Sequence, residues 1–432
     1  MGRVQPGCLG RFRHVCMGLL IVVSCALGQS SPEPTFPSSQ SNEAQGGITS
    51  RLFTLSRLGP EHLANAVHRK GAERNSYIVA WGDRLLQWPL AKNGAMREVY
   101  PRQEDWRYNN GGCAWDVDGD GVDEIVTSRG PEGHGGTPRQ HELVWFDEVE
   151  GRGQFRIHTF ARMDIVEWAA PHDIQPLEVQ VGEEQVRGVV YNVSRRQVYF
   201  AEVPRDPEAE WLIHAIGRFP SDMQSGMEIA DIDGDGRDDI VSGMFWIRTP
   251  QDPRRGNWSF YRYGEWQENQ WAGMVKPKVQ DMDGDGVAEI VVTEAEIPEA
   301  RLAIFKRGAD PTKLWQTHRL DKGLYAPHSL EVTDADEDGD YDIIAGEMTA
   351  GGWDFPMQEN PTIWIYVNQG GLSFHKGPLA QGEGVHEMKL APVRIDGMQV
   401  LFAADEIQLW KFSEMDTHVG FWLIVPPRRS PR

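Results

Sequence analysis

The sequence predicts an all-β protein, a seven-bladed β-propeller built from four-stranded blades with acidic loops in the inner hairpins. Three observations lead to this fold class. Four acidic segments of the 432-residue chain are near copies of one another, equivalent segments recur about every 50 residues, and the chain holds 46 Gly, 27 Pro and 16 Trp. Many short strands joined by turns require such a composition, and a repeat of this length is typical of propellers.

The chain begins with a segment that indicates export. Arg3, Arg11 and Arg13 precede an apolar stretch over 16–28 that is too short to span a bilayer. We therefore predict a signal peptide over 1–28, a Ser/Pro-rich disordered linker over 29–48 and the propeller over 49–432.

Two cleavage sites compete in this leader. Small residues at 26–28 suit a cut before Gln29, whereas Val22 to Cys25 resembles a bacterial lipobox, which would leave Cys25 lipidated. Either cut predicts a secreted, periplasmic or cell-surface protein. Contact with a membrane is expected only through a lipid on Cys25.

Charge and cysteine usage narrow the function classes. Removing the leader with its three arginines takes the formal net charge from −21 to −24, which argues against nucleic acid as a partner. Three of the four cysteines lie in the leader, so Cys113 alone remains and no intrachain disulfide can form in the body. An exported domain without disulfides needs another means of stabilisation.

The repeat itself gives the number of blades. The acidic segments 116–126, 231–241, 281–291 and 334–344 each lie between a short alternating segment and a β-branched pair, which predicts a hairpin. Three weaker copies keep the hydrophobic pair but lack the acidic turn. The seven pairs begin at positions 78, 125, 189, 240, 290, 343 and 400.

The two ends of the propeller leave one alternative open. Residues 52–58 resemble the last strand of a blade without its first three strands, so we predict that they pair into the C-terminal blade. The tail segment 421–425 competes for the same position.

The acidic loops predict metal sites. Side-chain oxygens at loop positions one, three, five and nine, with the carbonyl of position seven, form a cage for a hard cation, and Gly at position six permits the turn. An EF-hand would need a Glu at position twelve and flanking helices, which these segments lack. Calcium is favoured over magnesium because the loop offers several oxygens in a flexible shell, so we predict about four Ca²⁺ sites. The predicted ligands are Asp116, Asp118, Asp120, Val122 and Glu124; Asp231, Asp233, Asp235, Arg237 and Asp239; Asp281, Asp283, Asp285, Val287 and Glu289; and Asp334, Asp336, Asp338, Asp340 and Asp342, with Val122, Arg237, Val287 and Asp340 acting through their carbonyls.

These loops resemble the calcium loops of the FG-GAP/VCBS repeat family, which also occur in the integrin α-subunit propeller. The resemblance covers roughly residues 50–426 and is specific at the four loops. It implies a propeller with calcium in the hairpin turns of its bottom face. It implies no activity, because this fold serves adhesion proteins, lyases, dehydratases and scaffolds alike.

The inner strands predict a polar channel with a functional mouth. Six residues before each first Asp, or its equivalent, stand His62, Asn110, His172, Ser225, Val275, His328 and His386. Three residues further along stand Asn65, Cys113, Gln175, Glu228, Lys278, Glu331 and Lys389, with apolar residues between them. The histidines are expected at the end opposite the acidic loops, where the loops after the Ile-Val strands, including Glu296, also converge.

This mouth suits a sugar ligand, because indoles stack on sugar rings, a cation neutralises a uronate carboxylate and a His accepts a neighbouring proton. The candidate catalytic residues are His172, His328, His386, Arg129 and Glu347, and the candidate substrate-binding residues are His62, Lys276, Trp246, Arg248, Trp353 and Asp354. A structural role competes for each histidine, and a second metal held by the histidines with Glu347 has no supporting ligand spacing.

Three functions are compatible with these features. The first is an exported propeller that recognises carbohydrate, with an acidic polysaccharide as the expected ligand and lyase or dehydratase activity left open. The second is a non-catalytic adhesion or protein-binding module outside the cell, which the integrin-like loops and the missing catalytic motif favour. The third is a scaffold domain whose channel is only a consequence of packing.

Overall fold

The structure is a computed structural model in which the predicted signal peptide and almost all of the predicted linker lie outside the described residues. The described ranges are 42–43, 47–59, 63–90, 94–103, 106–131, 139–149, 152–165, 171–193, 195–220, 223–265, 274–349, 356–405 and 417–427. Among these residues, no helix is long and apolar enough to cross a membrane.

Seven antiparallel sheets form the seven blades, and the predicted fold class is confirmed. Blade 1 holds β3 (Leu63–Lys70), β4 (Ser76–Gly82), β5 (Leu85–Pro89) and β6 (Arg97–Tyr100), with the 3₁₀ turn η1 (Ala72–Arg74) in its first hairpin. Blade 2 holds β7 (Trp106–Trp115), β8 (Glu124–Pro131), β9 (Arg139–Val149) and β10 (Gln154–Ile165). Blade 3 holds β11 (Ile174–Val181), β12 (Glu184–Val193), β13 (Gln197–Glu202) and β14 (Leu212–Arg218).

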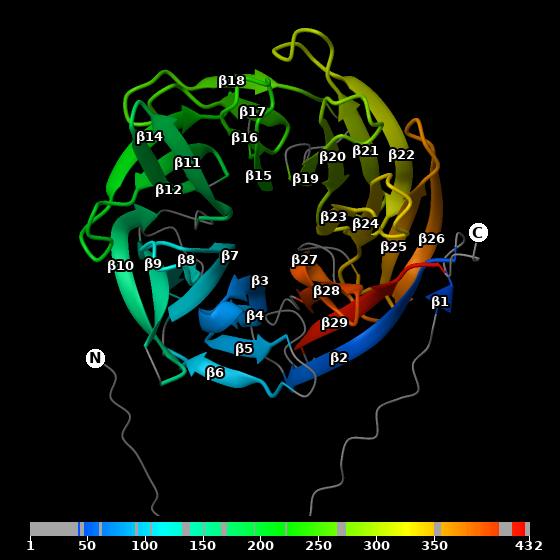
Figure 1. The fold of residues 1–432 in the computed structure, drawn as a ribbon, viewed down its shortest axis with the longest axis horizontal. Helices are drawn as coiled ribbons and strands as arrows, with labels where there is room; N and C mark the ends of the chain where they lie inside the picture. Colours follow the sequence, from blue (N-terminus) through cyan, green and yellow to red (C-terminus); the bar gives the residue numbers. More distant parts are fainter. Residues whose placement is uncertain are drawn as a thin grey trace, which may run out of the picture. The chain divides into compact units, whose positions relative to one another are not determined.

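The remaining blades repeat this order around the ring. Blade 4 holds β15 (Met227–Ala230), β16 (Asp239–Ser242), β17 (Phe245–Arg248) and β18 (Ser259–Arg262). Blade 5 holds β19 (Val275–Gln280), β20 (Glu289–Glu294), β21 (Ala300–Lys306) and β22 (Gln316–Leu324). Blade 6 holds β23 (Ser329–Thr333), β24 (Asp342–Gly346), β25 (Thr362–Asn368) and β26 (Phe374–Gln381). The first strand of each blade is innermost and borders the central axis (Figure 1).

Blade 7 closes the ring with strands from both ends of the chain. It contains β27 (His386–Ile395), β28 (Met398–Asp405), β29 (Thr417–Val425), β2 (Thr49–Gly59) and the short β1 (Asn42–Glu43), in the order β27-β28-β29-β2-β1. Figure 1 shows the blue N-terminal strand β2 beside the red C-terminal strand β29. Both competing segments therefore belong to this blade, since 417–425 forms its third strand and 49–59 its fourth.

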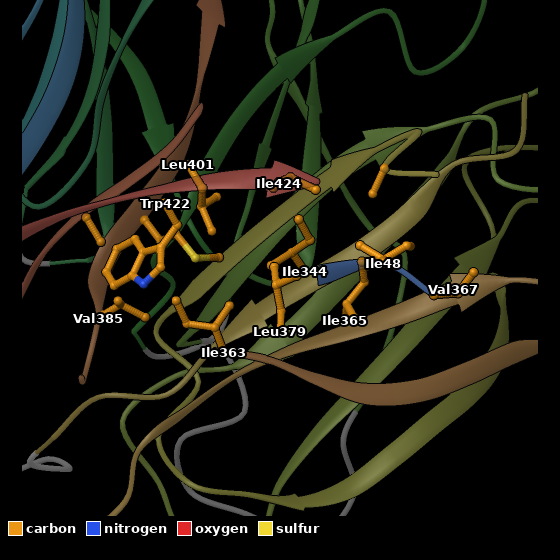
Figure 2. Packing of buried hydrophobic residues seen from close by; sticks show 13 residues of the cluster. Ile48, Ile344, Ile363, Ile365, Val367, Leu379, Val385, Leu401, Trp422 and Ile424 are labelled. Carbon is orange, nitrogen blue, oxygen red and sulfur yellow. The ribbon is translucent and has the colours of Figure 1, made fainter. Parts of the chain in front are cut away.

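The hydrophobic core lies between the blades. Among the described residues, the buried apolar side chains fall into seven clusters, each contributed by two adjacent blades. Figure 2 shows the cluster between blades 6 and 7, where Ile363 and Ile365 pack with Leu401 and Trp422. Ile48, the last residue of the predicted linker, is buried in the same cluster. Because each cluster needs two blades, ring closure buries apolar surface that the separate blades would expose.

Glycine permits a close approach between blades 4 and 5. Gly226 lies at φ +82°, and a Cβ built on it would meet the carbonyl oxygen of Val275 in blade 5 at 1.9 Å. A side chain at this position would force blades 4 and 5 apart, because backbone atoms cannot move aside as a flexible side chain can.

Candidate functional site

Two polar regions at opposite ends of the inner strands carry the candidate chemistry. The first consists of the four acidic loops, each in the hairpin between the first two strands of blades 2, 4, 5 and 6. In every loop three side chains offer carboxylate oxygens that lie within 4.8 Å of one another. These triplets are Asp116, Asp118 and Glu124; Asp231, Asp233 and Asp239; Asp281, Asp283 and Asp285; and Asp334, Asp336 and Asp342.

The loops share one backbone shape, with left-handed residues at positions four and six. In the first loop these are Gly119 (φ 84°) and Gly121 (φ 88°), whose amides both donate to the Asp116 carboxylate, at 2.7 and 3.0 Å. In the fourth loop Glu337 adopts φ 63° at position four. A non-glycine residue in that region costs about 1–2 kcal/mol, so the loop keeps this shape against a local preference.

The first and fourth loops fit a cation well. Burial, with Asp118, Asp120 and Asp116 nearby, raises the pKa of Glu124 to about 8. Burial likewise raises the pKa of Asp342 to about 7. Clustered carboxylates of this kind are stable in their charged form when a cation neutralises them, and oxygens at such spacing are the ligands that calcium prefers.

In the second and third loops, a positively charged side chain of the same blade contacts the loop carboxylates. Lys306, at the end of β21, contacts Asp283 and lies 2.6 Å from Asp285 and 3.2 Å from Glu289. Arg248, at the end of β17, contacts Asp233 in the same way. These side chains compete with a metal ion for the same oxygens.

The strand register explains which loops have such a cation. In each loop, position nine is followed by an isoleucine of the second strand of the blade. In loop order, these four isoleucines pair with Phe146, Ile247, Phe305 and Tyr366 of the third strands. One residue further along those strands stand Asp147, Arg248, Lys306 and Val367. The second and third loops therefore face a basic residue, whereas the first faces an acid and the fourth an apolar side chain.

The second region is a pocket in the central channel, formed by residues from all seven inner strands or the turns before them. Its cavity of about 70 Å³ is lined by three lysines and four carboxylates. Six of the seven polar residues predicted for the channel line it, namely Asn65, Gln175, Glu228, Lys278, Glu331 and Lys389. The seventh, Cys113, packs instead in the core between blades 2 and 3.

Three of the predicted histidines and Lys276 meet at one end of this pocket. His172, His328 and Lys276 line it, and the ring of His386 stacks on that of His328 with centroids 4.2 Å apart and planes 19° apart. His328 and His386 are each only 1% exposed. Lys276 contacts Glu387, which also lines the pocket.

Charge and burial set the protonation states in this cluster. Burial and the neighbouring Lys276 ammonium lower the pKa of His328, and burial places the pKa of His386 well below its usual range. Burial opposes the charge of Glu387, yet Lys276 and Lys389 hold its pKa well below its usual range. The cluster therefore combines neutral imidazoles with an ionised carboxylate at neutral pH.

The structure places two predicted mouth residues elsewhere. The turn between β16 and β17 occurs at 243–244, so the chain has already reversed direction at Trp246 and Arg248. Trp246 is fully buried in the core between blades 4 and 5, and Arg248 reaches the acidic loop at the opposite end. The prediction that these two side chains line the mouth is wrong.

Arg129 and Glu347 have partners that fix them within their blades. Arg129 pairs with Glu142 at 2.7 Å and stacks on Trp106. The Glu347 carboxylate accepts hydrogen bonds from the backbone amides of Tyr325 and Thr362. It also accepts hydrogen bonds from the side-chain amide of Gln358 and the indole of Trp364. These contacts indicate that Glu347 anchors a loop. His62, Trp353 and Asp354 lie outside the described residues.

Sequence reasoning missed Glu387 and Asp173, which each follow a predicted histidine. Regular strand alternation would turn the residue after a channel histidine away from the channel. Asp173 is instead held beside His172 at 3.3 Å by Asn192, whose amide donates to it at 2.6 Å. The only sequence feature that could have pointed to these two acids is that each directly follows a histidine predicted for the channel.

Comparisons with known proteins identify no family for this chain. No family model matches the chain, and no curated protein matches it. Similar solved structures include Sqt1 from Chaetomium thermophilum, also solved bound to the N-terminus of the ribosomal protein L10 (9% identity over 82% of this chain and 84% of that one, TM-score 0.47). Another is the intramolecular trans-sialidase from Ruminococcus gnavus in complex with oseltamivir carboxylate (11% identity over 86% and 96%, TM-score 0.40). At such values the likeness carries no argument about what this chain binds.

Proposed function

We propose that this chain is an exported, calcium-stabilised β-propeller that binds carbohydrate at the mouth of its central channel, with acidic sugar residues as the preferred ligand. The observation that supports this most directly is the pocket itself, where all seven inner strands or their preceding turns contribute lining residues. Polar groups that converge on one concave site are the usual mark of a small-molecule site.

The size of the pocket defines what enters it. A volume of about 70 Å³ is well below the roughly 300 Å³ of a site that encloses a whole small molecule. One substituent of a sugar, such as a carboxylate with its neighbouring hydroxyl, therefore enters the pocket, while the rest of the sugar stays at the mouth.

The charges of the pocket suit such a substituent. Lys276, Lys278 and Lys389 offer donors to a carboxylate, and the four acids of the lining accept hydrogen bonds from sugar hydroxyls. Burial lowers the pKa of Lys389 to about 8, so this ammonium stands to gain most from an anionic partner. A neutral sugar would satisfy the acids but leave the lysines without this gain.

The same binding mode would support proton abstraction next to the carboxylate. His328 and His386 are neutral because burial lowers their pKa, and a neutral imidazole is the form that accepts a proton. A lyase or dehydratase reaction on a uronate is therefore the activity that we would test for first.

Four calcium ions in the acidic loops complete the proposal, because the loops join the inner two strands of blades 2, 4, 5 and 6. An ion that binds the folded loop and not the unfolded chain raises the free energy of unfolding. The carboxylates that would hold it are those of the four triplets described above.

The test is retention on immobilised oligosaccharides, comparing uronate-containing with neutral chains in calcium buffer. We expect uronate chains to be retained, and Lys276→Met to weaken that retention at least tenfold. Lys313→Met, at a surface lysine whose side chain is 77% exposed, is the matched control. Equal retention of Lys276→Met and the wild type, or no retention of any sugar, would contradict the proposal and favour the protein-binding alternative. Ultraviolet absorbance of the same mixtures reports unsaturated uronate if catalysis occurs.

A further inference from the structure

We propose that His328, His386 and Glu387 form a binding site for a divalent transition metal ion of the zinc class, separate from the four acidic loops. Each of the three residues offers one ligand atom, and these atoms all lie within 4.8 Å of one another. The site shares His328 and Glu387 with the lining of the channel pocket, and it does not depend on the carbohydrate ligand proposed above.

A β-bulge builds this site. His386 pairs with Ala404 and Lys389 with Phe402, so two residues of β27 face a single residue of β28. Glu387 sits in this bulge at φ 50°. Bulges redirect side chains and are common beside active sites, and here the bulge lets two consecutive side chains reach one point.

Three strained backbone positions lie in or near the same cluster. Glu387 (φ 50°), Glu296 (φ 61°) and Ala326 (φ 42°) all lie in the left-handed region, and Glu296 contacts His328. Each such non-glycine residue costs on the order of 1–3 kcal/mol, and observed strain of this kind clusters at ligand-binding sites. The fold therefore maintains this arrangement against local preference.

The hydrogen bonding of His328 leaves one nitrogen for a ligand. Its Nε2 lies 3.3 Å from a carboxylate oxygen of Glu296, whereas its Nδ1 is buried and makes no hydrogen bond. That Nδ1 lies 3.5 Å from Glu387. Metal-binding histidines commonly present one nitrogen to the ion and the other to a carboxylate that fixes the ring.

The ligand set selects the class of metal. Two imidazoles and one carboxylate suit zinc and similar ions, while calcium prefers oxygens alone, as the acidic loops offer them. Three protein ligands leave a coordination position open. The adjoining cavity of about 70 Å³ has room for a water molecule to occupy that coordination position.

Lys276 is the cation nearest to Glu387 in the absence of metal, while the Lys389 ammonium lies 4.0 Å from the same carboxylate. Its ammonium contacts the Glu387 carboxylate that the ion would need. Metal binding must therefore displace Lys276, which makes this lysine a competitor whose removal tightens the site.

The experiment is a zinc titration of the full chain with calcium held saturating, so that the acidic loops are filled. Bound zinc is measured by equilibrium dialysis and elemental analysis, and Co²⁺ is titrated in parallel for its visible absorption. We expect Glu387→Gln and His386→Asn each to weaken one zinc equivalent at least 30-fold, and Lys276→Met to tighten it about tenfold. All variants are compared in the same chain, so the differences in zinc binding report the substituted channel residues.

Asp116→Asn is the matched control, since it should lose one calcium and leave zinc binding unchanged. Zinc binding that is identical in the wild type and in Glu387→Gln, or a Lys276→Met variant that binds zinc no more tightly, would overturn the proposal. Calcium-saturated melting temperatures identify any variant that has lost its fold, and the Lys276→Met result then decides alone.

Discussion

Replacing Lys306 by Met is expected to convert the third acidic loop from a weak calcium site into a strong one. In the present chain the Lys306 ammonium is shared among Asp283, Asp285 and Glu289. A calcium ion in this loop must either displace that ammonium or bind beside it. The methionine keeps the length of the side chain and removes its charge.

The magnitude follows from Coulomb's law. A divalent ion and an ammonium about 4 Å apart repel each other by about 2 kcal/mol at the dielectric constant of water, and by more in the partly buried loop. Removing this repulsion corresponds to at least a ~30-fold gain in affinity. The wild-type chain should accordingly show two tight calcium ions, in the loops at 116 and 334, and two weaker ones.

Isothermal titration of the chelated protein with calcium measures this directly. We expect the number of tight sites to rise from two to three in Lys306→Met, with no change in Lys322→Met, an exposed lysine of the same blade. Equal affinities at all four sites in the wild type, or an unchanged titration of Lys306→Met, would refute the competition between side chain and metal.

Three further predictions concern stability. In chelated protein, burial raises the pKa values of Glu124 and Asp342 to about 8 and 7, so the folded state holds protons that the unfolded chain releases near pH 4. The melting temperature should therefore fall as pH rises from about 4 to 8 and stay level above pH 8. Added calcium should remove this pH dependence. In urea unfolding, Gly226→Ala should lower the free energy of unfolding by at least 3 kcal/mol. Gly234 has φ +81° but open space around it, so Gly234→Ala should lower the free energy of unfolding by only about 1 kcal/mol. Equal losses in the two variants would show that the contact between blades is unimportant. Trp422→Ala, buried between blades 6 and 7, should cost about 3–5 kcal/mol in the same assay, and a loss below 1 kcal/mol would show that the closing blade contributes little.

Repetition made the fold predictable from the sequence. Four copies of the acidic hairpin fixed the repeat length, and the alternation of the inner strands placed Glu228, Lys278 and Glu331 in the channel, where they line the pocket. Such patterns are readable because they depend on periodicity within one strand.

Features that depend on the geometry between strands could not be predicted in this way. The two-residue turn before β17 moved Trp246 and Arg248 away from the mouth. The bulge at Glu387 broke the alternation that would have turned this side chain away. The contact of Lys306 with its loop depends on the register between β20 and β21, which the length of the connection alone does not reveal.

The pairing of Thr49 with Val425 constrains the order in which the chain acquires its structure. Strand β2 is synthesised before the strands of blades 1 to 6, but its partner β29 is synthesised after them, so blade 7 is completed after those six blades. Until then strand β2 has no partner, and the apolar faces of blades 1 and 6 that pack on blade 7 stay open to contacts with other chains. Long-range closure of this kind slows folding, because the entropy of a loop of several hundred residues is lost before its contacts form. The pairing of β2 with β29 that completes the ring therefore leaves newly made chains prone to aggregate until it forms.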